Sequence, residues 1–357
     1  MHTPIGHEAK KGGAAIASVP LTVLAVIASL AALHLGRVLL FPLVFATFLS
    51  LLLSPLIIAL GRLRIPRHVG AALIIGVVGS FSVVGVSELM EPAGMWLDRA
   101  PEVTAKLERR FKSWKQPLES INTIDRKLQS AAGASADDAV TVKISQPFVA
   151  SSLMTGTSSL LSNILAIVVL TFFFLAGGDR LLLKLVEGMP RLEQKKQAVE
   201  VVRAIQQNIS FYLINVTIIN AGLGLVVGLV LWLIGFPNPA LWGALVFVLN
   251  FAPYIGPTIG VAVLSLAGLL TYQEPLRAFT PALVCLAFNL VEGNVVTPAI
   301  LGYRLDLDPI AMLLFMFLWT WLWGFPGALL ALPILTCVKI VCDHTERFKP
   351  VGLFLVR

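Results

Sequence analysis

Residues 204–273 read AIQQNISFYLINVTIINAGLGLVVGLVLWLIGFPNPALWGALVFVLNFAPYIGPTIGVAVLSLAGLLTYQ, without a single Asp, Glu, Lys, Arg or His. One transmembrane helix needs about 20 apolar residues, so this stretch has room for two or three. The whole chain is also poor in charge: charged residues make up 13% of 357 positions, about half the share usual in soluble domains. The sequence therefore predicts an all-α polytopic membrane protein.

Working outward from this stretch, apolar segments of similar length recur along the chain. They predict about eight transmembrane segments, numbered 1–8 here: residues 15–33, 38–60, 69–87, 153–175, 212–234, 241–270, 279–296 and 309–341. Segments 6 and 8 contain glycine and proline, which interrupt helices, so we expect both to be broken or re-entrant. The sequence leaves open whether each crosses the bilayer. The expected hinge residues are Pro253, Gly256, Pro257, Gly324, Pro326 and Gly327.

Composition divides the chain into membrane and extramembrane parts. Residues 91–146 are polar, but Leu107, Phe111 and Trp114 recur at helical spacing, which predicts a small extramembrane helical excursion. The expected parts are 1–90 with segments 1–3, the excursion at 91–146, 147–178 with segment 4, a basic cytoplasmic segment at 179–211, 212–343 with segments 5–8, and a cytoplasmic tail at 344–357.

The basic residues are concentrated on one predicted side of the membrane. Arg62, Arg64, Arg67 and six basic residues of 180–203 fall in connections on the same side as both termini, which is the pattern of cytoplasmic loops. If 241–270 re-enters without crossing, Arg277 moves to the outer side and Arg304 to the inner side. The net charge of +7 is explained by this distribution and does not indicate a nucleic-acid partner.

Signals for catalysis or a bound cofactor are missing from the sequence. There is no G-x-x-x-x-G-K-[ST] phosphate loop, no H-E-x-x-H pair and no credible pairing of nucleophile and base. Cys285, Cys337 and Cys342 lack the spacing of a metal site or a disulfide framework. We therefore expect a protein that is not an enzyme and that has neither a metal nor a cofactor.

Glu292 is the most informative polar residue, because it lies within segment 7. A carboxylate at bilayer depth costs about 2.5–3.5 kcal/mol on insertion scales, and such a group usually faces the bundle interior or a wet cavity. Cys285, Asn289 and Glu292 share one helical face by their spacing. An amide beside a carboxylate can hold a proton, a sodium ion or a polar solute. The alternative is a structural role, in which Glu292 bonds to another helix or lies near an interface.

Three further asparagines are candidates for a transport pathway. Asn250 begins the Gly/Pro break of segment 6, where unpaired carbonyls and helix ends can bind ions. Asn220 lies in segment 5, where an interhelical hydrogen bond is the alternative role. Asn294 lies just past Glu292, where its amide could instead satisfy backbone groups near Pro298. For the break itself, the alternative is a kinked helix whose carbonyls are covered by neighbouring helices.

Several ordered motifs resemble one family. They are Asn250-Phe251-Ala252-Pro253-Tyr254-Ile255-Gly256-Pro257, Val291-Glu292-Gly293-Asn294-Val295-Val296-Thr297-Pro298, and Trp323-Gly324-Phe325-Pro326-Gly327-Ala328-Leu329-Leu330-Ala331-Leu332-Pro333. Together they resemble the autoinducer-2 exporter family of bacterial permeases over roughly residues 37–341. The resemblance implies a multispan permease of the bacterial cytoplasmic (inner) membrane with a helical excursion, assembled as a homo-oligomer.

The chain also departs from that family's pattern. Ile214-Asn215 stands where Gly-Gln is common, Asp308 where histidine is frequent, and Trp319 and Trp321 where residues are usually smaller. Some members of the family are associated with export of autoinducer-2 and others with sodium/proton exchange. Because these departures could alter the solute path, the substrate is not carried over with the fold.

Residues and resemblance together favour a secondary transporter that uses an ion gradient to export a small polar solute. Its partners would be that solute, a proton or sodium ion as the coupling ion, and the lipid bilayer. The second candidate is a sodium (cation)/proton antiporter. A candidate of another class is a non-transporting membrane scaffold or sensor that acts on the outer face through residues 91–146.

Overall fold

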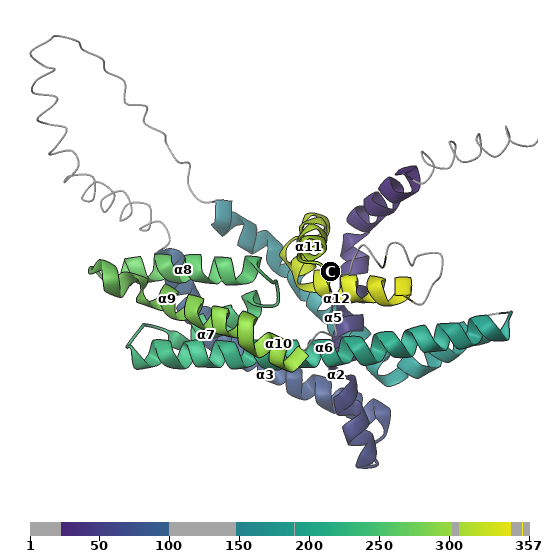
Figure 1. Cartoon of the computed structure of the whole chain (residues 1–357). Coiled ribbons are helices and arrows are strands. Elements are labelled where there is room, and N and C mark those ends of the chain that lie inside the picture. The colour runs from purple at the N-terminus through teal and green to yellow at the C-terminus, as the bar shows by residue number, and fades with distance from the viewer. Residues whose placement is uncertain (1–22, 100–147, 189, 302–306, 344–351, 353–357) are drawn as a thin grey trace, which may run out of the picture. The chain divides into compact units, whose positions relative to one another are not determined.

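The computed structural model describes residues 23–99, 148–188, 190–301, 307–343 and 352. A helix at Val23–Leu35 comes first. The elements that follow are α2 (Arg37–Arg62), α3 (Arg67–Asp98), α5 (Phe148–Glu187), α6 (Leu192–Leu233), α7 (Pro239–Leu249), α8 (Ile255–Thr271), α9 (Pro275–Val291), the π-helical turn η2 (Glu292–Val296), α10 (Thr297–Leu301), α11 (Pro309–Trp323) and α12 (Phe325–Asp343) (Figure 1). Most of the predicted excursion at 91–146 lies outside the described residues.

The all-α membrane architecture is confirmed. In the described part of the chain, five helical stretches are long and apolar enough to cross a bilayer: α2, α3, α6, the continuous run from α9 to α10, and α12. Shorter apolar helices lie at Val23–Leu35, within α5, and at α7, α8 and α11. In the residues that the structure describes, each of the eight apolar segments is therefore helical, apart from the breaks within segments 6 and 8.

Several helices extend beyond the apolar segments. α3 continues to Asp98, past the predicted end of segment 3 at residue 87 and into the stretch expected to begin the excursion. α5 runs to Glu187 and α6 begins at Leu192, so most of the basic segment 179–211 is helical as well. The reason is that Lys, Arg, Glu, Gln and Ala are strong helix formers, and loss of hydrophobicity does not by itself end a helix.

Both predicted breaks are present. α7 ends at Leu249 and α8 begins at Ile255, with Tyr254 at φ 62° between them. α11 ends at Trp323 and α12 begins at Phe325, with Gly324 at φ +71°. α7 has 11 residues, so at about 1.5 Å per residue it covers only about half of a 30 Å hydrocarbon core. This length supports the re-entrant alternative for 241–270.

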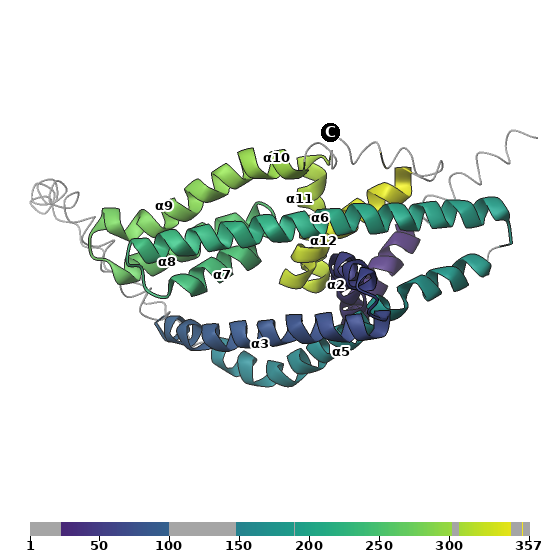
Figure 2. The same ribbon diagram turned by 90° about the horizontal axis from the view of Figure 1, so that it is seen from below.

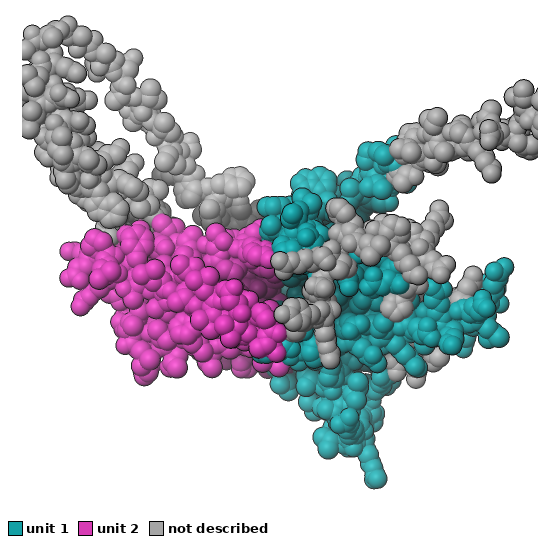
Figure 3. All heavy atoms as spheres, viewed as in Figure 1, with its two compact units in different colours: residues 1–77, 160–216, 300–357 teal, residues 78–159, 217–299 magenta. Residues whose placement is uncertain are grey.

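The chain forms two compact units, coloured separately in Figure 3. Unit 1 contains Met1–Val77, Leu160–Val216 and Ile300–Arg357, and unit 2 contains Val78–Ser159 and Thr217–Ala299. In unit 1, one buried cluster joins α2, α3 and α5, and another lies at the α11–α12 hairpin. The Glu292 region belongs to unit 2.

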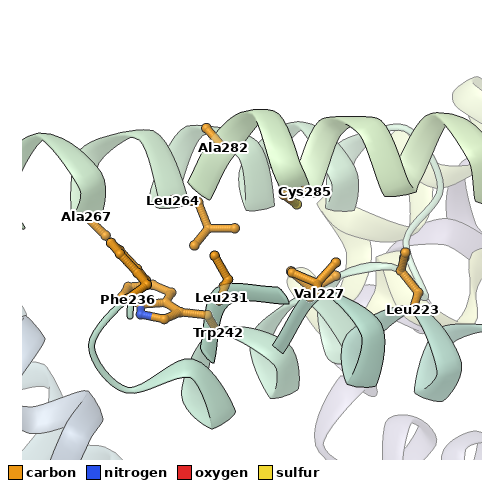
Figure 4. Packing of buried hydrophobic residues seen from close by; sticks show 10 residues of the cluster. Leu223, Val227, Leu231, Phe236, Trp242, Leu264, Ala267, Ala282 and Cys285 are labelled. Atoms are coloured by element: carbon orange, nitrogen blue, oxygen red, sulfur yellow. The ribbon is translucent and has the colours of Figure 1, made fainter. Parts of the chain in front are cut away.

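Unit 2 has its core between α6, α7, α8 and α9, which lie beside one another in Figures 1 and 2. Leu231 of α6 and Leu264 of α8 are fully buried and point toward each other (Figure 4). Trp242 of α7 closes one end of this core, and its indole Nε1 donates a hydrogen bond of 3.0 Å to the Pro237 carbonyl. These contacts hold the hairpin of α7 and α8 against α6.

Glycines allow α6 and α7 to approach at backbone distance. A Cβ added to Gly224 would lie 2.5 Å from the Gly243 carbonyl oxygen, and one added to Gly243 would lie 2.6 Å from the Gly224 carbonyl oxygen. Small residues at helix crossings serve this purpose in membranes, where packing replaces the hydrophobic effect as the force between helices. The crossing positions α7, and with it the break that follows α7.

This crossing gives a matched pair of substitutions on one helix. Gly224→Ala should destabilise the protein by about 1–3 kcal/mol, because the added methyl group meets backbone that cannot rotate away. Gly222→Ala should be neutral or slightly stabilising, because nothing lies within 4 Å of its added Cβ and alanine favours helix. Thermal unfolding in detergent micelles measures both. Equal melting temperatures for the two variants would show that the close crossing does not hold in the membrane protein.

Candidate functional site

Glu292 lies where the helix of segment 7 changes its winding. α9 ends at Val291, and residues Glu292–Val296 form a π-helical turn before α10 begins. Within this turn the backbone N–H of Thr297 donates to the carbonyl of Glu292, five residues back. Pro298 follows directly and has no N–H to donate, which weakens the ordinary helical ladder here. Such single π turns within α-helices occur frequently at functional sites.

The carboxylate of Glu292 is held by two neutral groups. Asn250 Nδ2 donates a hydrogen bond of 3.4 Å to Glu292 Oε2, and Thr297 Oγ1 donates to Glu292 Oε1. Asn250 Nδ2 also lies 3.3 Å from Asn220 Oδ1, to which it donates. We call Asn220, Asn250, Glu292 and Thr297 the Glu292 cluster. It joins α6, the end of α7, the π turn and the first residue of α10.

Each member of the cluster is placed by a local feature of the chain. Asn250 is the C-terminal cap of α7, so the end of this helix places its side chain in the cluster. Asn220 lies on the buried face of α6 with 2% of its surface exposed. Glu292 is half-buried in the same unit. The cluster is therefore a partly buried polar group within an otherwise apolar set of helices.

Thr297 was not among the residues selected from the sequence, although its hydroxyl contacts Glu292 directly. In an α-helix, positions five apart point in different directions, so a periodicity of 3.6 residues separates Glu292 from Thr297. The π turn brings the two together. The only signal in the sequence is Pro298, which marks a defect in the helix without specifying its type.

Asn289 bonds to Cys285, one turn earlier on the face that they share. Its Nδ2 donates to the Cys285 carbonyl at 2.8 Å and to Cys285 Sγ at 3.3 Å. The amide that reaches the carboxylate comes from Asn250, 42 residues earlier in the chain. Asn289 is buried, with 8% of its surface exposed. Its side chain therefore bonds within α9.

Two buried amide atoms lack a partner within the described part of unit 2. They are Asn220 Nδ2, a donor, and Asn289 Oδ1, an acceptor. A buried polar atom without a hydrogen bond is uncommon and costs about 1–3 kcal/mol. Asn220 Nδ2 belongs to the Glu292 cluster, so the cluster has a spare donor in addition to its carboxylate.

Asn294 lies outside the cluster. Its side chain is exposed, and its Nδ2 donates 2.8 Å to the Leu290 carbonyl of its own helix. This contact lies at Leu290, on the side of Asn294 away from Pro298, so it is not the contact with backbone groups near Pro298 that the sequence offered as the alternative.

The break between α7 and α8 satisfies several of its own carbonyls. The carbonyls of Ala252, Pro253 and Tyr254 accept from the backbone N–H groups of Gly256, Ile255 and Thr258. Gly256 is buried, and a Cβ there would collide with the Leu249 carbonyl. Pro257 is in the first turn of α8. These three carbonyls therefore each accept a hydrogen bond within the break or the first turn of α8.

The second break belongs to unit 1 and has an aromatic surface. A Cβ on Gly327 would collide with the Trp319 carbonyl, which explains glycine at this position. Gly324 has positive φ, and Pro326 lies in the first turn of α12. Trp319 and Trp323 pack edge to face with ring centroids 4.6 Å apart. Asp308, where the family often has histidine, caps α11 by accepting from Ile310 N and Ala311 N.

The Glu292 cluster can bind a proton or a hard cation. Its acceptors are all oxygens, from a carboxylate, an amide and a hydroxyl, which suit sodium or a proton better than a transition metal. Among the described residues there is no group of three His, Cys, Asp or Glu that could hold a metal ion. The cluster therefore has the chemistry of an ion or polar-solute site.

Comparison with known proteins gives one consistent result. Residues 23–347 match the family model described as AI-2E family transporter. The chain is similar to the AI-2 transport protein TqsA of Escherichia coli (strain K12), with 26% identity over 321 residues, 88% of each chain. It is also similar to "Putative transport protein YhhT" of the same organism, with 24% identity over 334 residues, 91% of this chain and 90% of YhhT. A protein of Haemophilus influenzae named "Putative transport protein" is 24% identical over 329 residues, 91% of this chain and 92% of its own.

The contact between Asn250 and Glu292 can be measured by a double-mutant cycle. Combining Asn250→Ala with Glu292→Ala should give a coupling free energy of about 0.5–1.5 kcal/mol, as expected for one polar contact between membrane helices. The control cycle replaces Asn250→Ala by Asn294→Ala and should give a value near zero, because Asn294 bonds only within its helix. Reversible unfolding in mixed micelles supplies the four stabilities of each cycle. Equal coupling in the two cycles would contradict the geometry.

Proposed function

The chain belongs to the AI-2E transporter family, and from this premise we propose that it is a secondary permease in which Glu292 couples solute movement to an ion gradient. The solute is small and polar, and the direction of transport is export. The protein acts in the bacterial cytoplasmic membrane as a homo-oligomer with both termini in the cytoplasm. The distribution of basic residues along the sequence supports that orientation.

The observation that carries this proposal is the set of neutral partners around Glu292. Its carboxylate accepts from the amide of Asn250 and the hydroxyl of Thr297. Both donors are neutral, so the carboxylate keeps its net charge, and a charged side chain at membrane depth is costly. Binding a proton or a sodium ion removes that charge. The occupancy of Glu292 then depends on the ion gradient, which is what a coupling group requires.

In this proposal, binding of an ion at Glu292 acts on the break of segment 6, which is the part of the chain that moves. Asn250 ends α7 and touches both Glu292 and Asn220, so neutralising Glu292 changes the contacts of the break. Asn220 Nδ2 is a spare donor for a polar solute. Asn289 and Asn294 would act as supporting residues near this path. The hinge of the α7–α8 hairpin would consist of Pro253, Gly256 and Pro257. The hinge between α11 and α12 would consist of Gly324, Pro326 and Gly327.

The relative TqsA is named for AI-2 transport, which makes autoinducer-2 the first solute to test. A sodium/proton antiporter is the second candidate, because Glu292, Asn220 Oδ1 and Thr297 Oγ1 are oxygen ligands of the kind sodium prefers. The scaffold hypothesis rests on residues 91–146, which lie mostly outside the described part of the chain.

Proteoliposomes test the coupling role of Glu292. In Glu292→Gln, accumulation of autoinducer-2 driven by a proton or sodium gradient should fall to the level of protein-free vesicles, because the amide binds neither ion as a carboxylate does. Exchange of labelled for unlabelled solute without a gradient should continue, because glutamine resembles the neutral form of Glu292. The control Glu274→Gln removes a carboxylate of the same unit that is exposed and paired with Arg277 at 3.4 Å, and should transport normally.

Other outcomes separate the alternatives. Loss of folded protein in Glu292→Gln, judged by gel filtration, would favour the structural role of the residue. Sodium-dependent proton movement without any solute, followed with an internal pH dye, would identify an antiporter. Wild-type vesicles that move neither autoinducer-2 nor ions, together with loss of the cellular effect on deleting 91–146, would favour the scaffold.

A further inference from the structure

A group of aromatic side chains in unit 2 has no role in the transport proposal. The ring of Trp96, from α3, has its centroid 5.0 Å from that of Trp242 and 6.4 Å from that of Phe236. Phe236 in turn lies 6.1 Å from Trp242 and 6.0 Å from Tyr272. These separations are in the range at which aromatic rings attract one another. We call Trp96, Phe236, Trp242 and Tyr272 the aromatic cluster.

The aromatic cluster lies at the base of the α7–α8 hairpin. Phe236 precedes α7, Trp242 is in the first turn of α7, and Tyr272 directly follows α8. The contact of Phe236 with Tyr272 therefore joins the two ends of segment 6. Phe236 and Trp242 lie together at one end of the core of unit 2 (Figure 4). Asn250 caps the opposite end of α7, so the Glu292 cluster lies at the tip of the hairpin.

Trp96 is the side chain through which α3 reaches this base. It is half-buried and packs against the core of unit 2. Phe81, Val83 and Val84 lie earlier on α3 in the same unit and are each more than half exposed. The guanidinium of Arg99 lies 5.7 Å from the centroid of the Trp96 ring, which adds a cation–π contact. A single substitution at Trp96 therefore removes the ring contacts of α3 with the hairpin.

The side-chain contacts at the two ends of the hairpin differ in strength. At the tip, Asn250 donates at 3.4 Å to Glu292 and at 3.3 Å to Asn220, both longer than the roughly 2.7–3.2 Å usual for N–H···O bonds. At the base, large rings pack on one another, and packing is the main force between helices in a membrane. The base is therefore the fixed end of the hairpin and the tip is the end that yields first.

We propose that Trp96 is a positioning residue for transport, which holds the base of the α7–α8 hairpin and thereby keeps Asn250 against Glu292. Trp96 acts through the hairpin and touches neither the solute nor the ion. This inference rests on the proposed hinge at 253–257. When the base is released, the hairpin tilts and its tip leaves Glu292 more often, so the break opens more frequently.

Labelling of a cysteine in the break measures this opening. Ala252 has none of its surface exposed, so Ala252→Cys reacts with a thiol reagent only when the break opens. In the full chain in nanodiscs, Trp96→Ala should raise the labelling rate at least about threefold, because local opening becomes easier. Trp96→Phe keeps a ring and should give a smaller increase.

Two controls accompany the labelling. Trp232→Ala removes an indole of α6 in the same unit that is 63% exposed, and it should leave the rate within about twofold of the wild type. The chain without Ala252→Cys reports any reaction of the native cysteines Cys285, Cys337 and Cys342, which is subtracted.

The double-mutant cycle of Asn250 and Glu292 gives a second readout. In a Trp96→Ala background their coupling should fall to less than about half of its wild-type value, because the tip is no longer held in place. General destabilisation would lower all four stabilities alike and leave the coupling unchanged. In proteoliposomes, the maximal rate of autoinducer-2 exchange should change at least about threefold while KM stays within about twofold, because Trp96 does not touch the path.

Two results would overturn the proposal. One is equal labelling of Ala252→Cys with Trp96→Ala and with Trp232→Ala, and the other is an unchanged coupling of Asn250 with Glu292. If Trp96→Ala yields no folded protein, Trp96→Leu takes its place with the same expectations. Labelling and the cycle need no transport, whereas the coupling role of Glu292 is judged by gradient-driven accumulation, so the two proposals fail by different measurements.

Discussion

The hydrogen bond from Asn250 to Glu292 joins the only charged side chain of the π turn to the point at which segment 6 breaks. A half-buried carboxylate among apolar helices needs polar partners, and a continuous apolar helix offers none at its surface. Because α7 ends at Asn250, the break places a polar side chain next to the carboxylate. The interruption of the helix and the presence of Glu292 are therefore parts of one arrangement.

That arrangement depends on how closely the helices approach. Gly224 and Gly243 let α6 and α7 meet at backbone distance, and four residues before Gly224 lies Asn220, which accepts from Asn250. One helical turn separates the packing contact from the polar contact on the same helix. Gly256 acts at the other side of the break, where only glycine lets α8 begin against the end of α7. Small residues thus control the distances within the Glu292 cluster.

The sequence was sufficient for those features that depend on composition along a single segment. The uncharged stretch at 204–273 predicted the membrane helices, and the glycines and prolines at 253–257 and 324–327 predicted both breaks, because each effect is local. The contact of Asn250 with Glu292 crosses 42 positions, and no pattern within one helix encodes it. Thr297 was missed because helical periodicity assumes 3.6 residues per turn, whereas η2 is wound more loosely. Asn289 precedes the π turn and bonds to Cys285, which shares its helical face by spacing, so ordinary periodicity applies there.

The two broken segments use the same backbone device with different chemistry. In each, a glycine of the second helix lies against a carbonyl near the end of the first: Gly256 against Leu249, and Gly327 against Trp319. At the first break the adjoining side chain is Asn250, which reaches a carboxylate. At the second it is Trp323, whose Nε1 donates to the Leu33 carbonyl at 3.2 Å and whose ring packs on Trp319. A glycine contact of this kind permits a hairpin but supplies no ligand. The side chain beside each break sets its chemistry: Asn250 reaches a carboxylate, which is why the proposed ion site lies there, whereas Trp323 packs against a neighbour.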